Sequence, residues 1–196
     1  HTRLHVIIRP RGGDFLYSDI EIRTMLKDIE IARKLGADGV VSGCLTAEGE
    51  VDLPAMQKLM EAAQGLSVTF HRAFDMCCDP FKALEIIEQL GCERILTSGQ
   101  QRTAEEGIPL LKELIKRATE VIVMPGCGVN AANVQKIATE TGAREFHLSA
   151  RMYVGSDMIF RNPAVSMGGT VQVAEYGREV SSTEKIKETI LALKNE

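Results

Sequence analysis

The sequence predicts a parallel α/β fold, because short apolar runs alternate with amphipathic helical segments along a single domain, residues 1–196. We expect strands at 4–9, 38–43, 67–72, 93–98, 120–125 and 145–149. We expect helices near 19–35, 54–64, 80–90, 103–118, 130–141 and 183–194. Strict alternation implies parallel strands with right-handed crossovers. Two closures fit this order, an open doubly wound sheet and an eight-stranded barrel.

A recurring glycine marks the step from helix to strand. The segment Leu-Gly-Ala-Asp-Gly-Val at 35–40 is echoed by Leu-Gly-Cys-Glu-Arg-Ile at 90–95, and more loosely by 141–146. Each first glycine follows an amphipathic run, where a helix commonly ends in a left-handed residue. A short apolar run comes next each time, which is typical of a buried parallel strand.

The expected helix starts carry capping residues. Ser18 and Glu21 form a capping box ahead of apolar residues at helical spacing. Asp79 precedes a first-turn proline, which favours a helix start there. Thr103 opens a second capping box, and Asn130 is the expected cap of the next helix. These signals support the helix boundaries given above.

Composition excludes several classes of function. The net charge is −4 and no run of Lys and Arg forms a positive stripe, so we expect no nucleic-acid partner. No apolar stretch approaches the ~20 residues of a membrane helix, and we expect no membrane partner. Five irregularly spaced cysteines and no signal-peptide layout predict reduced thiols in the cytoplasm.

Polar residues at strand ends indicate where a site would form, because parallel α/β folds place ligands at the carboxyl ends of their strands. Arg9 and Arg11 follow the first expected strand. Two guanidiniums beside a flexible glycine pair suit an anionic ligand. The structural alternative is an ion pair between an arginine and Asp14 that holds the loop.

The third expected strand ends in a candidate catalytic group. Alternation places Thr69 and His71 on one strand face. His71 could act as a general acid or base, with Asp75 orienting it and Arg72 beside it. The structural alternative is a core histidine that hydrogen-bonds to a neighbouring carbonyl.

Later strand ends supply further candidates for anion binding. Ser98 follows the fourth strand, where helix capping is an equal alternative. Gly126 and Gly128 precede an expected helix start, which binds anions through its free amides. His147 and Ser149 share one face of the sixth strand. The glycines could instead serve turn geometry alone.

The cysteines raise the question of a metal. Cys77 and Cys78 are the candidate metal ligands, because soft thiolates suit Cu(I). Adjacent cysteines do not have zinc spacing, which is usually C-x₂₋₄-C. The structural alternative is buried free thiols, which are common in protein cores.

Several segments together resemble the CutC family, named for copper homeostasis. The longest is 5–19, which contains Arg-Pro-Arg-Gly-Gly-Asp, and the next is 68–76, which contains Thr-Phe-His-Arg-Ala-Phe-Asp. The match continues in order through 94–99, 126–130, 145–151, 160–162 and 175–176. The resemblance implies a TIM-type (β/α) barrel that begins with two further βα units. We therefore expect six of the eight strands here.

The resemblance implies control of copper homeostasis, with Cu(I) or copper as ligand. The family cysteines most often proposed to bind copper belong to the two units that this sequence lacks, so no ligand is carried over. The alternative is a barrel enzyme acting on a small phosphorylated or carboxylated anion, with Arg161 joining the anion-binding residues. A third reading is a non-catalytic barrel that acts through its surface, as a homodimer.

Overall fold

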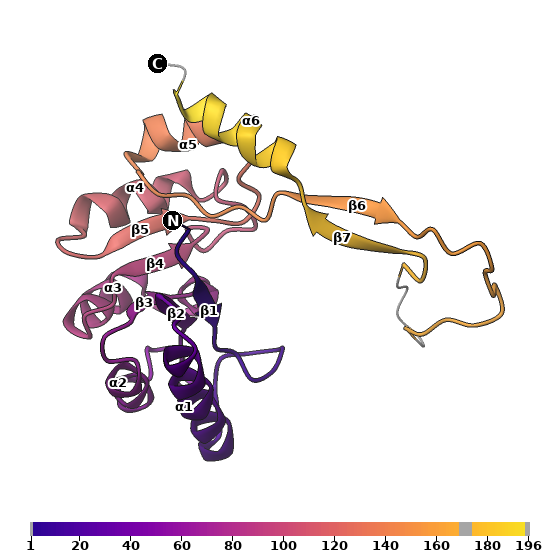
Figure 1. The fold of residues 1–196 in the computed structure, drawn as a ribbon. Helices are drawn as coiled ribbons and strands as arrows, with labels where there is room; N and C mark the ends of the chain where they lie inside the picture. The colour runs from indigo at the N-terminus through magenta and orange to yellow at the C-terminus, as the bar shows by residue number, and fades with distance from the viewer. Residues whose placement is uncertain (1, 169–173, 195–196) are drawn as a thin grey trace.

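The computed structural model describes residues 2–168 and 174–194. One parallel sheet contains, in sequence order, β1 (His5–Ile7), β2 (Gly39–Ser42), β3 (Ser67–Phe70), β4 (Arg94–Thr97) and β5 (Ile122–Pro125). The connections carry α1 (Asp19–Lys34), α2 (Leu53–Ala62), the 3-10 helix η1 (Arg72–Met76), α3 (Pro80–Gln89), α4 (Ile108–Arg117) and α5 (Val134–Thr141). The curved sheet and its outer helices form part of a TIM-type barrel (Figure 1).

Side chains on each strand alternate between two faces. Ile8, Val40, Phe70, Ile95 and Val123 are buried. Fully buried helix residues share their hydrophobic core: Met25, Ile29, Met56, Ile87, Leu111, Leu114 and Ile137. The intervening strand residues point to the concave inner face and line a pocket there. Because successive side chains of a β-strand point to opposite faces, alternate residues belong to the hydrophobic core and to the pocket.

The glycines predicted to end three helices, and the capping residues predicted to begin two of them, are confirmed. Gly36, Gly91 and Gly142 have φ values of 83°, 78° and 78°, the left-handed conformation that terminates a helix. At the start of α1, the Glu21 carboxylate accepts hydrogen bonds from the backbone N–H and hydroxyl of Ser18. Asp79 accepts from the first two free amides of α3. Local capping chemistry thus fixes where these helices begin and end.

Two helices begin later than predicted. The helix expected at 103–118 starts at Ile108, because 103–107 forms a turn whose Ala104 N–H donates to the carbonyl of Cys127. The helix expected from 130 starts at Val134, because Asn130 accepts from the N–H of Ala132 instead of capping α5. Both turns hold the loops at the carboxyl ends of β4 and β5.

The sixth predicted strand, 145–149, is wrong. Its only bridge pairs His147 with Gly126, and the chain then turns at Ala150, where φ is 45°. The sequence analysis also missed an antiparallel hairpin of β6 (Arg151–Gly155) and β7 (Gly177–Ser181), which projects away from the sheet before α6 (Thr183–Lys194) (Figure 1). The sheet of described residues therefore has five strands where six were expected.

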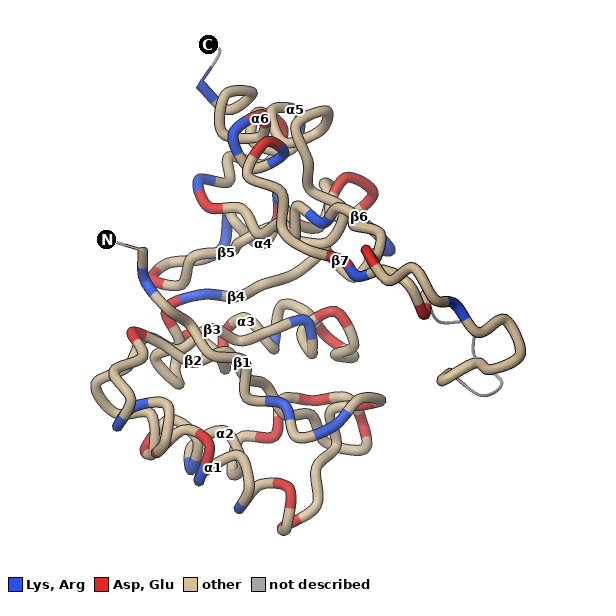
Figure 2. Tube along the Cα trace, turned by 45° about the vertical axis from the view of Figure 1, so that its right-hand side comes forward, with Lys and Arg blue, Asp and Glu red and all other residues tan. Residues whose placement is uncertain are grey.

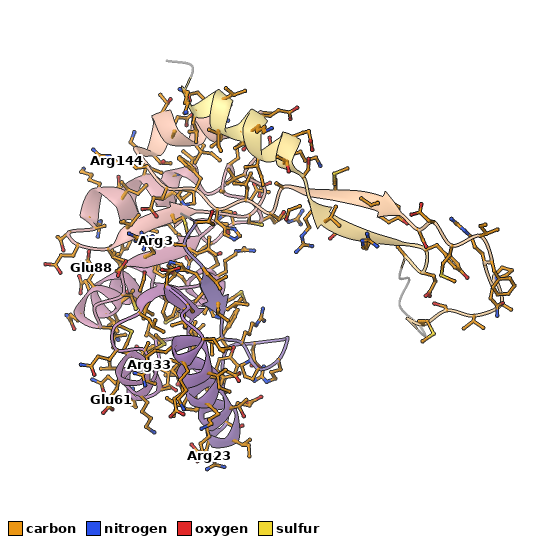
Figure 3. All side chains as sticks on the ribbon, in the orientation of Figure 1. Arg3, Arg23, Arg33, Glu61, Glu88 and Arg144 are labelled. Atoms are coloured by element: carbon orange, nitrogen blue, oxygen red, sulfur yellow. The ribbon has the colours of Figure 1, made fainter. Side chains whose placement is uncertain are left out.

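Charged residues of both signs are scattered over the described part of the chain. Lys and Arg positions are interspersed with Asp and Glu positions along the helices and loops (Figure 2). Glu88 near the end of α3, labelled in Figure 3, ties that helix to the segment just before β5 by accepting from the N–H groups of Thr119, Glu120 and Val121. Within the described residues, no helix is both long and apolar enough to cross a membrane.

Candidate functional site

The concave face of the sheet carries a pocket of about 720 Å³, called the inner pocket here. Its apolar wall comes from inward-facing strand residues and one loop residue: Ile7, Phe15, Val41, Leu96 and Met124. Its polar groups are guanidiniums and imidazoles: Arg3, Arg9, Arg72, Arg94, His5, His71 and His147. No carboxylate is among the described residues that line it. The volume suits a small molecule, and the charge favours an anion.

His71 stands at the carboxyl end of β3 and lines this pocket with Thr69, so the predicted shared face is confirmed. The residue is 4% exposed. Nδ1 accepts a hydrogen bond from the backbone N–H of Ala73, 3.2 Å away. Nε2 is buried and has no hydrogen-bond partner among the described residues. A buried polar atom without a partner costs free energy, which a ligand would recover.

The environment of His71 favours its neutral form. Burial, aided by the charge of Arg9, lowers the pKa of His71 from 6.5 to about 4. Since Nδ1 accepts from Ala73, the single proton of the neutral ring lies on Nε2. At neutral pH, His71 is therefore a neutral imidazole with a buried N–H donor on Nε2. The backbone partner of Nδ1 is an amide, where a carbonyl was the predicted alternative.

The predicted pairing of His71 with Asp75 is wrong. The Asp75 carboxylate is 5% exposed and accepts from the hydroxyl of Thr97 and from the N–H groups of Ser98 and Gln100. The Nε of Arg72 also donates to it, at 2.6 Å. Asp75 therefore ties η1 to the loop after β4 and positions Arg72, and it makes no hydrogen bond to the imidazole.

Ser98 belongs to the same network and is fully buried. Its hydroxyl donates to the carbonyl of Gln101 at 2.6 Å, and it accepts from the terminal nitrogen of Arg72 at 3.0 Å. Its N–H is bonded to Asp75. The expectation that Ser98 binds an anion directly is therefore wrong, because its polar atoms are already used.

The two arginines that follow β1 have different roles. Arg9 donates to the carbonyl of Gly13 at 2.7 Å, lies 4.7 Å from the ring of Phe15 and lines the inner pocket. Arg11 pairs with Asp14 and Glu21 and donates to three loop carbonyls. The structural alternative therefore holds for Arg11, and its prediction as an anion ligand is wrong. Arg9 keeps its place at the pocket.

The β5 loop and the following segment form a second pocket, called the edge pocket here, of about 390 Å³. Its lining includes three residues that were predicted to bind an anion: Gly128, His147 and Ser149. Gly126 does not line it, and its N–H donates to the carbonyl of Thr97. A Cβ on Gly126 would clash with the side chain of Leu96, so this glycine serves close packing.

Arg161 lies outside both pockets. It follows β6 in the projecting hairpin, with its guanidinium 4.9 Å from the ring of Tyr176. The prediction that it joins the anion-binding residues is wrong, because the hairpin carries this segment away from the sheet (Figure 1).

The cysteines do not converge. Cys77 is buried and Cys78 is exposed, so adjacent thiols face different environments. Burial raises the pKa of Cys44, Cys77 and Cys92 to about 12, which keeps these thiols protonated and disfavours metal binding. In 2–168 and 174–194, no group of three or more His, Cys, Asp or Glu side chains is placed to hold a metal ion. The residues described here do not fit a copper centre, and Cys77 and Cys78 do not form the predicted metal pair.

The sequence analysis did not predict several residues that line the two pockets. Leu96 and Met124 alternate with buried core residues on β4 and β5, and this period-two pattern could have identified them. Phe15 sits in a loop, and Lys185 lies in the first turn of α6. No local pattern indicates that these two residues reach a pocket.

Comparison with known proteins identifies the relatives of this chain. Residues 1–152 match the model of the CutC family. The chain belongs to the CutC family. A family protein CutC from Bacteroides thetaiotaomicron is 67% identical over 195 residues, which is 99% of this chain and 78% of that relative. The predicted family is confirmed.

Two further relatives extend the comparison. The human copper homeostasis protein cutC homolog is 49% identical over 191 residues, covering 97% of this chain and 70% of that protein. A crystal structure of CutC from Streptococcus agalactiae superposes with a TM-score of 0.71 at 39% identity, covering 74% of this chain and 71% of that chain. This CutC-family chain therefore shares its fold with a solved member of the family.

Proposed function

We propose that this chain binds a small organic anion in the inner pocket. The observation that carries the proposal is His71, which lines the pocket and whose buried Nε2 has no hydrogen-bond partner among the described residues. Its N–H would donate to one oxygen of a carboxylate or phosphate. Arg9 and Arg72 would supply positive charge beside it.

The apolar wall decides what kind of anion fits. Leu96, Met124 and Val41 offer hydrocarbon surface below the polar groups, so a ligand with a short apolar or neutral body buries more surface than a bare ion. A neutral imidazole N–H can also polarise a substrate carbonyl by donating a hydrogen bond to its oxygen. The pocket therefore favours anion binding as its main function, and polarisation of a substrate carbonyl is the secondary proposal.

Calorimetry with glycolate and benzoate tests this proposal. We expect binding to the wild-type chain that weakens about tenfold in His71→Asn and in Arg9→Gln, since one charged hydrogen bond contributes about 1.4 kcal/mol. Arg23→Gln is the matched control, because Arg23 lies on α1, away from the pocket (Figure 3). Equal affinities in Arg9→Gln and Arg23→Gln would rule the pocket out as the binding site.

A second candidate is a role in copper homeostasis, favoured by the name of the human relative. The separated thiols support no multi-thiolate Cu(I) site within the described part of the chain. We therefore propose that any Cu(I) bound by this chain is held weakly, with Cys78 as its exposed thiol. Competition with bicinchoninate measures this directly. Stoichiometric capture of Cu(I) that Cys78→Ser leaves intact would contradict it.

We also propose the cytoplasm as the compartment of this chain. All five cysteines are free thiols, which supports a reducing environment. Localisation of a tagged full-length protein, with the thiols trapped by alkylation on lysis, checks this proposal.

A further inference from the structure

The edge pocket adjoins the inner pocket. Arg72, Leu96 and His147 line both of them, so these three residues form the boundary between the two pockets. The far wall of the edge pocket comes from the β5 loop, the start of β6 and the first turn of α6. A ligand long enough to pass these shared residues would contact both pockets.

The edge pocket is positively charged. Arg72, Arg151 and Lys185 line it, and none of its lining residues is Asp or Glu. Arg72 and Arg151 already pair with Asp75 and Glu179. Lys185 donates to the carbonyl of Arg151 at 2.6 Å, and it has no ion pair among the residues that the structure describes. An ammonium group has three donors, so Lys185 keeps capacity for an anion.

Backbone groups add donors to the same wall. The carbonyl of Gly128 accepts from the side-chain amides of Asn130 and Asn133, each at 2.9 Å. The N–H groups of Gly128 and Val129 make no hydrogen bond within 2–168 and 174–194. Two backbone donors beside an ammonium group suit the three oxygens of a phosphate better than the two of a carboxylate.

We propose that the two adjoining pockets together take a small metabolite with two anionic groups, a carboxylate at His71 and Arg9 and a phosphate at Lys185 and the Gly128 amide. This inference rests on the proposed function, because the buried Nε2 of His71 is the independent sign of a ligand in the inner pocket. Leu96 and His147, shared by both pockets, would flank the body that joins the two groups.

Calorimetry with separate and joined anions tests the inference. The probes are glycolate, inorganic phosphate, and the phosphorylated carboxylates phosphoglycolate, phosphoglycerate and phosphogluconate, which differ in the distance between their anionic groups. We expect one phosphorylated carboxylate to bind at least about tenfold more tightly than glycolate or phosphate, because the second contact becomes intramolecular. Lys185→Gln should remove that gain and leave glycolate affinity unchanged.

Lys187→Gln is the matched control, since Lys187 is exposed on the same helix and outside both pockets. If Lys185→Gln binds every phosphorylated carboxylate as well as wild type does, the edge pocket is not a phosphate site. The same conclusion follows if no phosphorylated carboxylate binds more tightly than glycolate. In both cases, glycolate binding that depends on His71 would still support the proposed function of the inner pocket. If the chain binds none of the probes, both the proposed function and this further inference are overturned.

Discussion

The ring of Phe15 lies 4.9 Å from the imidazole of His71, centroid to centroid, at an interplanar angle of 56°. The guanidinium carbon of Arg9 lies over the same Phe15 ring, 4.7 Å from its centroid. Phe15 therefore shields His71 from water, while Arg9 adds a nearby positive charge. Both effects disfavour a protonated imidazole, and this arrangement makes His71 a neutral donor.

The stability of the chain should depend on pH through His71. The folded-state pKa of about 4 lies below the ordinary 6.5, so the unfolded chain binds the proton more readily between these values. The contribution of neutral His71 is fully present above pH 6.5 and is lost as the pH falls toward 4. The total loss should be about 3 kcal/mol.

Urea unfolding at a series of pH values measures this contribution. In His71→Asn the side-chain carbonyl can still accept from the N–H of Ala73, but the group no longer titrates. We expect the free energy of unfolding of the variant to fall less steeply between pH 6.5 and 4 than that of the wild type. Identical slopes would contradict the pKa shift of His71.

Asp75→Asn should destabilise the fold. An asparagine amide would present N–H groups to the N–H donors of Ser98 and Gln100 and would leave Arg72 without its carboxylate. We expect a loss of about 3 kcal/mol in the free energy of unfolding, measured with urea. Asp14→Asn breaks an ion pair whose carboxylate side chain is 72% exposed, and should cost less than about 1 kcal/mol. Equal losses in the two variants would refute a structural role for the Asp75 network.

Gly107→Ala should also be costly, because a Cβ at this position would clash with the backbone carbonyl oxygen of Ser98. Backbone atoms cannot move aside as the end of a flexible side chain does, so we expect a loss of about 3 kcal/mol. Gly12→Ala is the comparison, since nothing lies within 4 Å of the added Cβ and the change should stay below about 1 kcal/mol. Thermal unfolding of both variants decides whether the contact between the β4 loop and α4 is this close.

Thiol reactivity should separate the adjacent cysteines. Cys78 is exposed, whereas burial raises the pKa of Cys77 to about 12. We expect a disulfide reagent at about pH 8 to modify Cys78 in the folded chain and Cys77 only after unfolding. Cys78→Ser should abolish most of the fast absorbance change, and Cys77→Ser should preserve it. Fast modification that survives in Cys78→Ser would mean that another thiol is open to solvent.

The features predicted correctly from sequence are local or periodic. Glycines after helices, capping residues before them and alternation along strands depend on neighbours a few residues apart. The shared face of Thr69 and His71 follows from such a rule, and the structure bears it out. The five parallel strands and their helices were predictable for the same reason.

The incorrect predictions concern partners that are distant in sequence. Asp75 was paired with His71 because they are neighbours in the chain, but its partners Thr97 and Ser98 come from the next strand. The guanidinium of Arg11 donates to backbone carbonyls of its own loop, and no sequence pattern predicts these hydrogen bonds. The β6–β7 hairpin was missed because a long loop joins its strands, where a recognisable two-residue turn would have indicated pairing.

In the parallel sheet, the strand order β1-β2-β3-β4-β5 makes every strand pairing a pairing between consecutive βα units. Such a chain resembles a linear array, in which each unit gains free energy from its two neighbours. The unit around β3 has a neighbour on each side, whereas β1 has one. Native-state hydrogen exchange should therefore show a gradient of opening free energies, lowest at the ends of the array and highest in its middle, so that fraying from the ends precedes global unfolding.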